Sequence, residues 1–405
     1  MTTTNPLSFG PYRAHQVTDR ALIVEGAGLT LALTPLTDRL LRVRAAAGGF
    51  APRRSWDAAR ADADFAPVPF TVEVSEAELV LRAGALAAHV DRASGRVALA
   101  DGAGRRFAED AAAPEASAGG PVRVAKQIAA GEHFYGFGER GGLFEKTNRR
   151  LVNWTTDPVN PHGPAVDPMY IAIPIYLAVQ PGLAYGVFFH NTFRSVFEVG
   201  RLPADQLLWQ ADGGEVDYYV AYGPTPAEVA RSWAALLGVT PLPPYWALGH
   251  HQSRWSYMTA DEIRAVAAEL RRRELPSDAI HFDIDYMRGF RVFTWDPARF
   301  PDPAGLVADL RRDDFHAVTI IDPGVKADPA YAVYQSGLAG DHFIRTAAGE
   351  VAHGYVWPDD SVFPDFMRPE TRAWWGEQQR VLTEAGVSGV WNDMNEPVVF
   401  DKPFS

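Results

Sequence analysis

The pattern of the sequence changes near Thr225, from short strand-like runs to an alternation of strand-like and helix-like segments. Before that point, runs such as 71–74 and 79–82 are rich in apolar and β-branched residues. Turn pairs such as Ser94-Gly95 follow at hairpin spacing. After it, apolar runs alternate with amphipathic segments, which implies a parallel sheet with right-handed crossovers. We therefore predict a multidomain β plus α/β protein.

Residues 1–224 are predicted to form an N-terminal β-sandwich domain, because their strand signals recur with turns between them. The Ala/Gly-rich stretch 111–120 interrupts this pattern and is predicted to be a mobile loop. Residues 225–244 are predicted to be a connecting helix and a Pro-rich linker. Thr225-Pro-Ala-Glu228 has the form of a capping box with proline at the first helical position.

Residues 245–405 are predicted to hold about four strand–helix units. The predicted strands are 246–249, 279–283, 317–322 and 387–391. The predicted helices begin near Thr259, at Asp302-Pro303 and at Pro369. A complete (β/α)8 TIM barrel needs about 250 residues, so this region provides only the first half of one.

Three of the four predicted strands end on an acid, namely Asp283, Asp322 and Asp393. Strand ends in a parallel barrel converge on one face, so these acids should line one pocket. Taken singly, each acid could instead cap the helix that follows it. Three tryptophans lie in the same predicted loops: Trp255, Trp357 and Trp391. Together with the acids they favour a binding or catalytic site.

The last predicted strand runs into Trp391-Asn-Asp-Met-Asn-Glu-Pro397. This segment resembles the nucleophile signature of glycoside hydrolase family 31, which contains α-glucosidases and α-xylosidases. Further segments resemble family motifs in the same order, so the resemblance runs from about residue 134 to 400. These segments are 134–140, 153–157, 245–257, 281–287, 356–358 and 363–366.

The resemblance implies a retaining α-glycosidase in which Asp393 is the nucleophile. Glu396 is counted with it among the catalytic residues, as one that orients its neighbours. Asp157 and Asp283 would accept hydrogen bonds from hydroxyls of the sugar, and apolar or aromatic side chains would wall the pocket. The residues expected in this wall are Trp255, Ile284, Ile320, Trp357, Trp391 and Met394. The form of the 283–287 motif favours a glucosidase over a xylosidase, with an α-glucoside oligosaccharide or glycoside as substrate.

In the family, the general acid sits on a later strand of the barrel, which would lie beyond Ser405. We therefore expect a C-terminally truncated chain that is inactive alone, and leave open whether a second polypeptide completes the barrel. The alternative is a non-catalytic carbohydrate-binding or scaffold protein derived from the same family.

Other classes of function are disfavoured. The net charge of −12 argues against nucleic acid as a partner, and no apolar run suits a signal peptide or a bilayer span. We expect a cytoplasmic protein without membrane contact, cofactor or metal. The glycine pattern at 136–141 lies among strands with no helix after it, and Asp283-Ile-Asp285 lacks the further oxygen ligands of a metal site.

Overall fold

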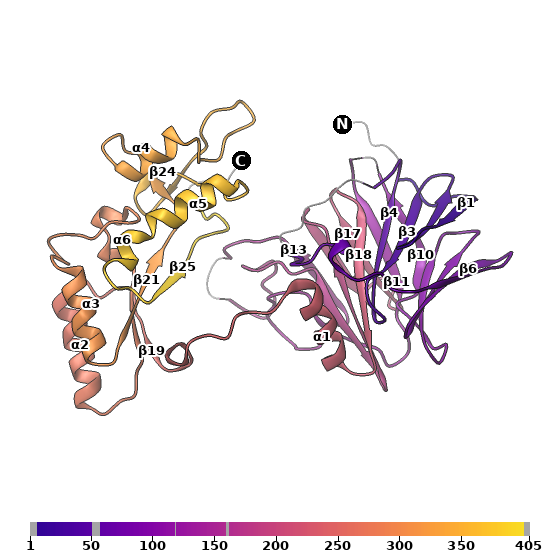
Figure 1. The fold of residues 1–405 in the computed structure, drawn as a ribbon, viewed down its shortest axis with the longest axis horizontal. Coiled ribbons are helices and arrows are strands. Elements are labelled where there is room, and N and C mark those ends of the chain that lie inside the picture. Colours follow the sequence, from indigo (N-terminus) through magenta and orange to yellow (C-terminus); the bar gives the residue numbers. More distant parts are fainter. Residues whose placement is uncertain (1–5, 51–56, 118, 159–161, 401–405) are drawn as a thin grey trace. The chain divides into compact units, whose positions relative to one another are not determined.

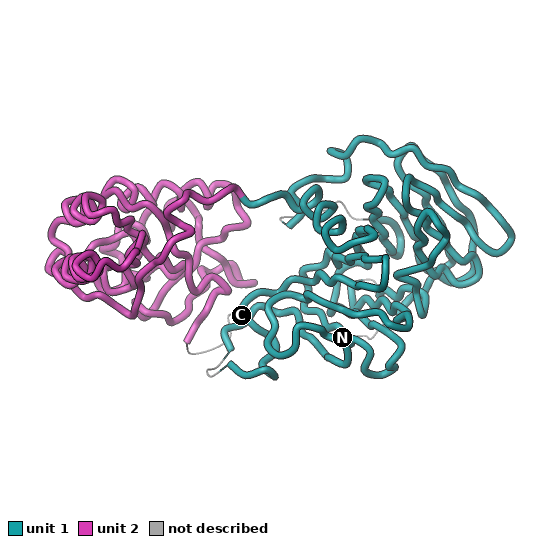
Figure 2. The backbone as a smooth tube through the Cα atoms, turned by 90° about the horizontal axis from the view of Figure 1, so that it is seen from below, with its two compact units in different colours: residues 1–240 teal, residues 241–405 magenta. Residues whose placement is uncertain are grey.

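The computed structural model describes residues 6–50, 57–117, 119–158 and 162–400. The chain forms two compact units, residues 1–240 and residues 241–405 (Figure 2). Each unit has its own hydrophobic core.

Unit 1 contains three antiparallel sheets, whose strands follow in spatial order. The first sheet has eight strands: β1 (Tyr12–Val17), β2 (Leu22–Gly26), β3 (Thr30–Pro35), β4 (Leu40–Ala46), β18 (Val216–Gly223), β15 (Leu183–Phe189), β14 (Ile175–Gln180) and β12 (His133–Gly136). The second has five: β10 (Asp110–Ala116), β11 (Val122–Gln127), β17 (Gln206–Ala211), β16 (Ser195–Val199) and β13 (Arg149–Asn153). The third has five: β5 (Thr71–Val74), β6 (Glu78–Ala83), β7 (Leu86–Asp91), β8 (Val97–Asp101) and β9 (Arg106–Phe107).

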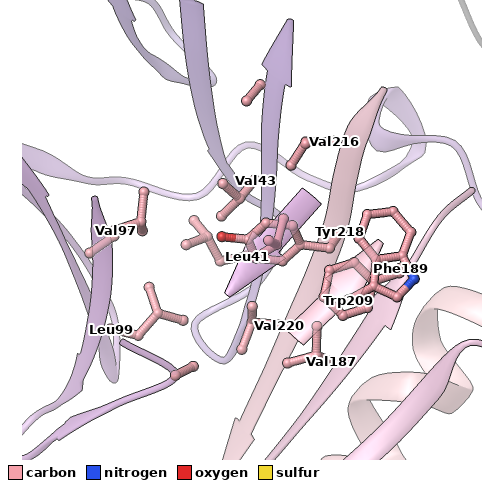
Figure 3. Packing of buried hydrophobic residues seen from close by; sticks show 14 of the residues in the cluster. Leu41, Val43, Val97, Leu99, Val187, Phe189, Trp209, Val216, Tyr218 and Val220 are labelled. Atoms are coloured by element: carbon pink, nitrogen blue, oxygen red, sulfur yellow. The ribbon is translucent and has the colours of Figure 1, made fainter. Parts of the chain in front are cut away.

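Aromatic side chains from different sheets meet in the core of unit 1 (Figure 3). The ring of Trp209 on β17 stacks on Phe189 of β15, with ring centroids 4.2 Å apart, and Tyr218 of β18 packs against the same Phe189 at 5.5 Å. All three side chains are fully buried. Two sheets that share one apolar core in this way form a sandwich, so the predicted β-sandwich is confirmed.

The predicted loop at 111–120 is wrong over most of its length, and residue 118 lies outside the described residues. Residues 110–116 form β10, which pairs antiparallel with β11. Just beyond β10, the Ser117 amide donates to the Pro121 carbonyl at 3.0 Å. At the start of β10, Asp110 accepts a hydrogen bond from the buried Lys126 ammonium at 2.6 Å. A partner strand and a buried ion pair therefore override the low strand propensity of alanine.

The described residues of unit 1 also form a short 3-10 helix, η1 (Asp62–Asp64), and an α-helix. The α-helix is α1 (Pro226–Leu237), which begins after Thr225. Its buried Val229 and Leu236 pack with Phe188 of β15 in a second, smaller hydrophobic cluster between α1 and the eight-stranded sheet.

Unit 2 is built on a parallel sheet of four strands: β19 (His251–Gln252), β20 (Ala279–Phe282), β21 (His316–Ile321) and β25 (Gly389–Asn392). Its α-helices are α2 (Ala260–Arg272), α3 (Pro303–Arg312), α4 (Ala332–Ala339), α5 (Pro369–Gln378) and α6 (Arg380–Thr383). Its 3-10 helices are η2 (Tyr245–Leu248), η3 (Ile284–Tyr286) and η4 (Arg288–Phe290). A small antiparallel sheet of β22 (Val325–Lys326), β24 (Asp359–Val362) and β23 (His353–Val356) lies in the long connection between β21 and β25.

Helices α2 and α3 lie side by side along the parallel strands (Figure 1). Their buried Ile263 and Leu306 enter one core with Ile280 and Phe282 of β20. Parallel strands separated by helices on this pattern are the βαβ units of a barrel. The predicted partial barrel is confirmed.

The first predicted barrel strand, 246–249, is wrong. Residues 245–248 form η2, a 3-10 turn in which the Gly249 amide donates to the Trp246 carbonyl at 3.2 Å. The ladder starts later, where His251 pairs with Ala279. A short apolar run does not by itself distinguish a strand from a helical turn, and here the turn forms with Tyr245 and Leu248 exposed.

We predict that the 405-residue polypeptide self-associates. The parallel sheet ends at β19 on one side and β25 on the other, and Val390 on β25 is 40% exposed. Open apolar strand edges are templates for pairing with another chain. Size-exclusion chromatography with light scattering should show species larger than a monomer. Val390→Lys should shift them toward the monomer, whereas a monodisperse monomer of the unmodified chain would refute the prediction.

Candidate active site

Three acids stand at the ends of neighbouring parallel strands. Asp283 follows β20, Asp322 follows β21 and Asp393 follows β25. Ile320 pairs with Trp391, and the Asp393 amide donates to the Ile321 carbonyl at 3.2 Å, so the ladder continues to the acids.

Alternation along the strands places these acids on a common face. Asp322 is two residues after Ile320, and Asp393 is two residues after Trp391, so each points the same way as the paired residue before it. Neighbouring strands lie about 4.8 Å apart. The face that carries Ile320 and Trp391 therefore ends in a row of carboxyl groups.

The three acids differ in burial. Asp322 is 7% exposed, Asp283 is half-buried and Asp393 is exposed. Burial, followed by repulsion from the Asp393 and Asp283 carboxylates, raises the pKa of Asp322 to about 7. Burial also raises the pKa of Asp283, and Asp285 and Asp393 add to the shift against the lowering effect of the Ile284 amide. The site can thus hold a proton near neutral pH.

Local turns fix the two outer acids. Asp283 Oδ1 accepts a hydrogen bond from the Ile284 amide at 2.7 Å, where η3 begins. Asp393 Oδ1 accepts one from the Met394 amide at 2.8 Å. Met394 is half-buried and has a φ of 59°, a left-handed conformation that non-glycine residues adopt infrequently. Each carboxylate therefore has one fixed oxygen and one that remains available.

Apolar and aromatic side chains surround the strand ends. Ile284 and Ile320 are buried, and Trp391 is half-buried. Trp357 lies in the hairpin between β23 and β24 and meets Trp255 edge to face, with ring centroids 5.5 Å apart. Trp255 is 67% exposed, so its ring is open to a ligand. Flat aromatic faces of this kind can pack on the C–H surface of a sugar.

Two further predicted site residues are Asp157 and Glu396. Asp157 lies in unit 1, after β13, and is exposed. Glu396 follows Asp393 in unit 2, and its Oε2 atom is buried without a hydrogen-bond partner in the described structure. Their proposed roles, like the sugar contacts of the other residues, remain predictions.

The fold and the order of the motifs can be compared with known proteins. Residues 240–405 match the glycosyl hydrolases family 31 TIM-barrel domain, and residues 30–198 match the glycosyl hydrolase 31 N-terminal galactose mutarotase-like domain. The chain belongs to glycoside hydrolase family 31.

Relatives of this family 31 chain include two curated enzymes. It is 45% identical over 283 residues to alpha-glucosidase 2 of Bacillus thermoamyloliquefaciens, covering 70% of this chain and 36% of that protein. It is 33% identical over 284 residues to an alpha-glucosidase of Saccharolobus solfataricus, covering 70% of this chain and 40% of that protein. The chain thus spans well under half the length of these relatives.

The fold of the family 31 chain also matches solved structures. A family 31 dextranase of Flavobacterium johnsoniae, complexed with isomaltotriose, superposes with a TM-score of 0.88 at 27% identity. The match covers 96% of this chain and 48% of that one. A soil-metagenome α-xylosidase complexed with xylose, at 20% identity and a TM-score of 0.83, shows the same fold.

A pair of histidines lies beside the site of the family 31 chain, and the sequence analysis did not predict it. His251 Nδ1 lies 3.0 Å from His281 Nε2, and the His281 ring lies 5.8 Å from the Trp391 ring. Burial, and secondly His251, lower the pKa of His281. The signal in the sequence is the placement of His281 two residues before Asp283, which puts both on one strand face.

The described part of the family 31 chain contains no group of three or more His, Asp or Glu side chains suited to hold a metal ion. None of its described helices has the length and apolarity needed to cross a membrane.

Proposed function

We propose that this chain supplies the nucleophile and part of the glucose pocket of a retaining α-glycosidase that hydrolyses terminal α-glucosides. The observation that carries the proposal is the position of Asp393, exposed at the end of a parallel strand beside two further strand-end acids. In TIM-barrel enzymes, residues at the carboxyl ends of the strands perform the chemistry. The alpha-glucosidase names of its relatives support the substrate class.

The reaction assigned to Asp393 is a double displacement. Its carboxylate attacks the anomeric carbon, the bond from that carbon to the leaving oxygen breaks, and a general acid gives the leaving oxygen a proton. The conjugate base of that acid then takes a proton from water, the water oxygen bonds to the anomeric carbon on the face opposite the ester, and Asp393 leaves as a carboxylate, so the configuration is retained. Asp393 suits the first step because it is exposed and only one of its oxygens is hydrogen-bonded to the adjacent amide.

We propose that the general acid lies outside residues 245–400, in another part of the complete protein. Such an acid must stand about 5 Å from the nucleophile and reach the leaving group. Asp322 is too buried to do so, and Asp283 is assigned to a sugar hydroxyl. The wall of the pocket would be formed by apolar and aromatic side chains, namely Ile284, Ile320, Met394 and the tryptophans. Asp157 and Glu396 would be further contacts of the sugar.

The stereochemistry of the first product tests this proposal. The complete gene product is mixed with an aryl α-glucoside, and the anomeric proton of the released glucose is followed by NMR before mutarotation. We expect α-glucose first. Initial release of β-glucose, or no release of glucose from any α-glucoside offered, would contradict the proposal.

We predict that hydrolysis needs no metal ion. The mechanism uses two carboxyl groups, and the described residues hold no metal-ligand cluster. Exhaustive chelation followed by gel filtration should leave kcat and KM of the complete gene product unchanged. Loss of activity that a single divalent ion restores would show that the prediction is wrong.

A further inference from the structure

Asp322 is the most buried of the three strand-end acids, and no described residue gives it a positively charged partner. Asp322 Oδ1 is buried without a hydrogen-bond partner, and Asp322 is 7% exposed. None of Asp322, Asp283 and Asp393 forms an ion pair among the residues whose side chains the structure describes. A buried carboxylate beside two others, with no cation, is strongly disfavoured relative to its neutral acid.

The groups that face Asp322 come from three elements. Asp283 approaches from the end of β20 and Asp393 from the end of β25. From η3, Tyr286 lies near enough for the Asp322 charge to affect it, but its hydroxyl donates elsewhere, to the Ile320 carbonyl at 2.9 Å. The tyrosine proton is therefore used for the Ile320 carbonyl, and the charged groups that act on Asp322 are the two strand-end carboxylates.

We propose that Asp322 is a positioning residue whose carboxylic acid form donates a hydrogen bond to the Asp393 carboxylate and holds it at the strand end. The strand register supports this partner. The pairing of Ile321 with Asn392 places Asp322 and Asp393 next to each other, on the same face of adjacent strands. The Met394 amide already fixes one oxygen of Asp393, so a donor at Asp322 would orient the carboxylate from a second direction.

This role rests on the proposed function and predicts a pH dependence. The raised pKa of Asp322 means that the acid form is present below about pH 7 and is lost as the pH rises through that value. Ionised Asp322 can no longer donate, and it repels the Asp393 carboxylate. Turnover should therefore fall on the alkaline side for a reason separate from the general acid.

Two variants of the complete gene product test the proposal through kinetics. Asp322→Asn keeps a donor that cannot ionise, so kcat near pH 6 should stay within about threefold of the wild type and the alkaline fall should move to higher pH. Asp322→Ala removes the donor, so kcat should drop roughly ten- to hundred-fold with little change in KM, the usual range for a hydrogen bond to a charged group. An alkaline limb that stays in place in Asp322→Asn, or full activity of Asp322→Ala, would overturn the proposal.

The effect of the leaving group on the activity of the Asp322→Ala variant distinguishes a positioning role of Asp322 from a role as general acid. If Asp322 were the general acid, Asp322→Ala would spare substrates with activated aryl leaving groups, because these need little protonation. A positioning role predicts the same fold-loss for activated aryl glucosides and for maltose. Selective sparing of the aryl substrates would therefore overturn it.

A spectroscopic readout does not depend on turnover. Infrared difference spectra of the wild type against Asp322→Asn should show the carbonyl stretch of a protonated carboxyl at pH 6 that disappears above neutral pH. Absence of that band would overturn the proposal even in an active enzyme. A band in a protein that hydrolyses no α-glucoside would uphold the protonated Asp322 and contradict the proposed function instead.

Discussion

Asp393→Asn in the complete gene product is expected to lower kcat by about four orders of magnitude or more. Removal of a catalytic nucleophile costs about this much in other enzymes. The amide cannot form the glycosyl ester, while its size and its acceptor oxygen for the Met394 amide are kept. Because Asp393 is exposed, the substitution should leave the fold intact. Steady-state kinetics with an aryl α-glucoside measures the change.

The matched control is Asp313→Asn, an exposed acid at the end of α3 in the same unit. It should retain wild-type kcat and KM, since Asp313 precedes the amino-terminal end of β21, whereas the three acids follow the carboxyl ends of their strands. If Asp393→Asn kept more than about a tenth of the wild-type kcat, less than 1.4 kcal/mol of the activation barrier would depend on this carboxylate, and it could not be the nucleophile.

Asp217→Ala is expected to cost the β-sandwich about 3–5 kcal/mol of stability, the usual penalty for breaking a buried ion pair. Asp217 on β18 is fully buried and accepts two hydrogen bonds from the Arg42 guanidinium, at 2.9 and 2.7 Å. A third contact joins it to His190 Nδ1 at 3.2 Å. Removing the carboxylate leaves the buried Arg42 guanidinium with its ion pair to Asp62 and its position over the Tyr219 ring. Hydrogen exchange of peptides from β4 and β18 measures the loss.

The control for this substitution is Glu73→Ala, which breaks an exposed ion pair with Arg82. Solvent screening makes such surface pairs weak, so exchange should change little. If Asp217→Ala behaved like Glu73→Ala, the buried network would not stabilise the sandwich in the way described.

The same network gives the stability of the sandwich an acid dependence. Burial acts to raise the pKa of Asp217, but hydrogen bonds from Arg42 and His190 outweigh it and lower the value to about 2. A carboxyl whose pKa is lower in the folded than in the unfolded protein stabilises above its unfolded pKa, near 4. That contribution should be lost as the pH falls from about 4 to about 2, and Asp217→Ala should remove it.

The positions of the last three barrel strands were predictable from local pattern. The runs before Asp283, Asp322 and Asp393 are apolar and short, and each is followed by an acid where the structure ends a strand. The spacing of apolar residues and the residue type at the end of a strand are local properties, so they can be recognised in a single sequence. The same holds for the hairpins of the sandwich.

The features that the sequence analysis predicted wrongly or did not predict depend on contacts between distant parts of the chain. Strand β10 is rich in alanine and forms because β11 pairs with it and Lys126 neutralises Asp110. The run at 245–248 is apolar like a strand, but it turns before the ladder begins. The burial of Asp322 comes from strands and a 3-10 helix that the chain assembles around it, so its pKa could not be read from its neighbours in sequence.

Covalent trapping tests the role of Asp393 most directly. The complete gene product is treated with a fluorinated glucosyl fluoride that forms the glycosyl ester faster than water cleaves it, and the labelled protein is digested and sequenced by mass spectrometry. We predict one glucosyl-type label, on the peptide that contains 391–397 and on Asp393 itself, with no label in Asp393→Asn. A label on Asp283, Asp322 or Glu396, or persistent labelling of the Asp393→Asn protein, would contradict the assignment.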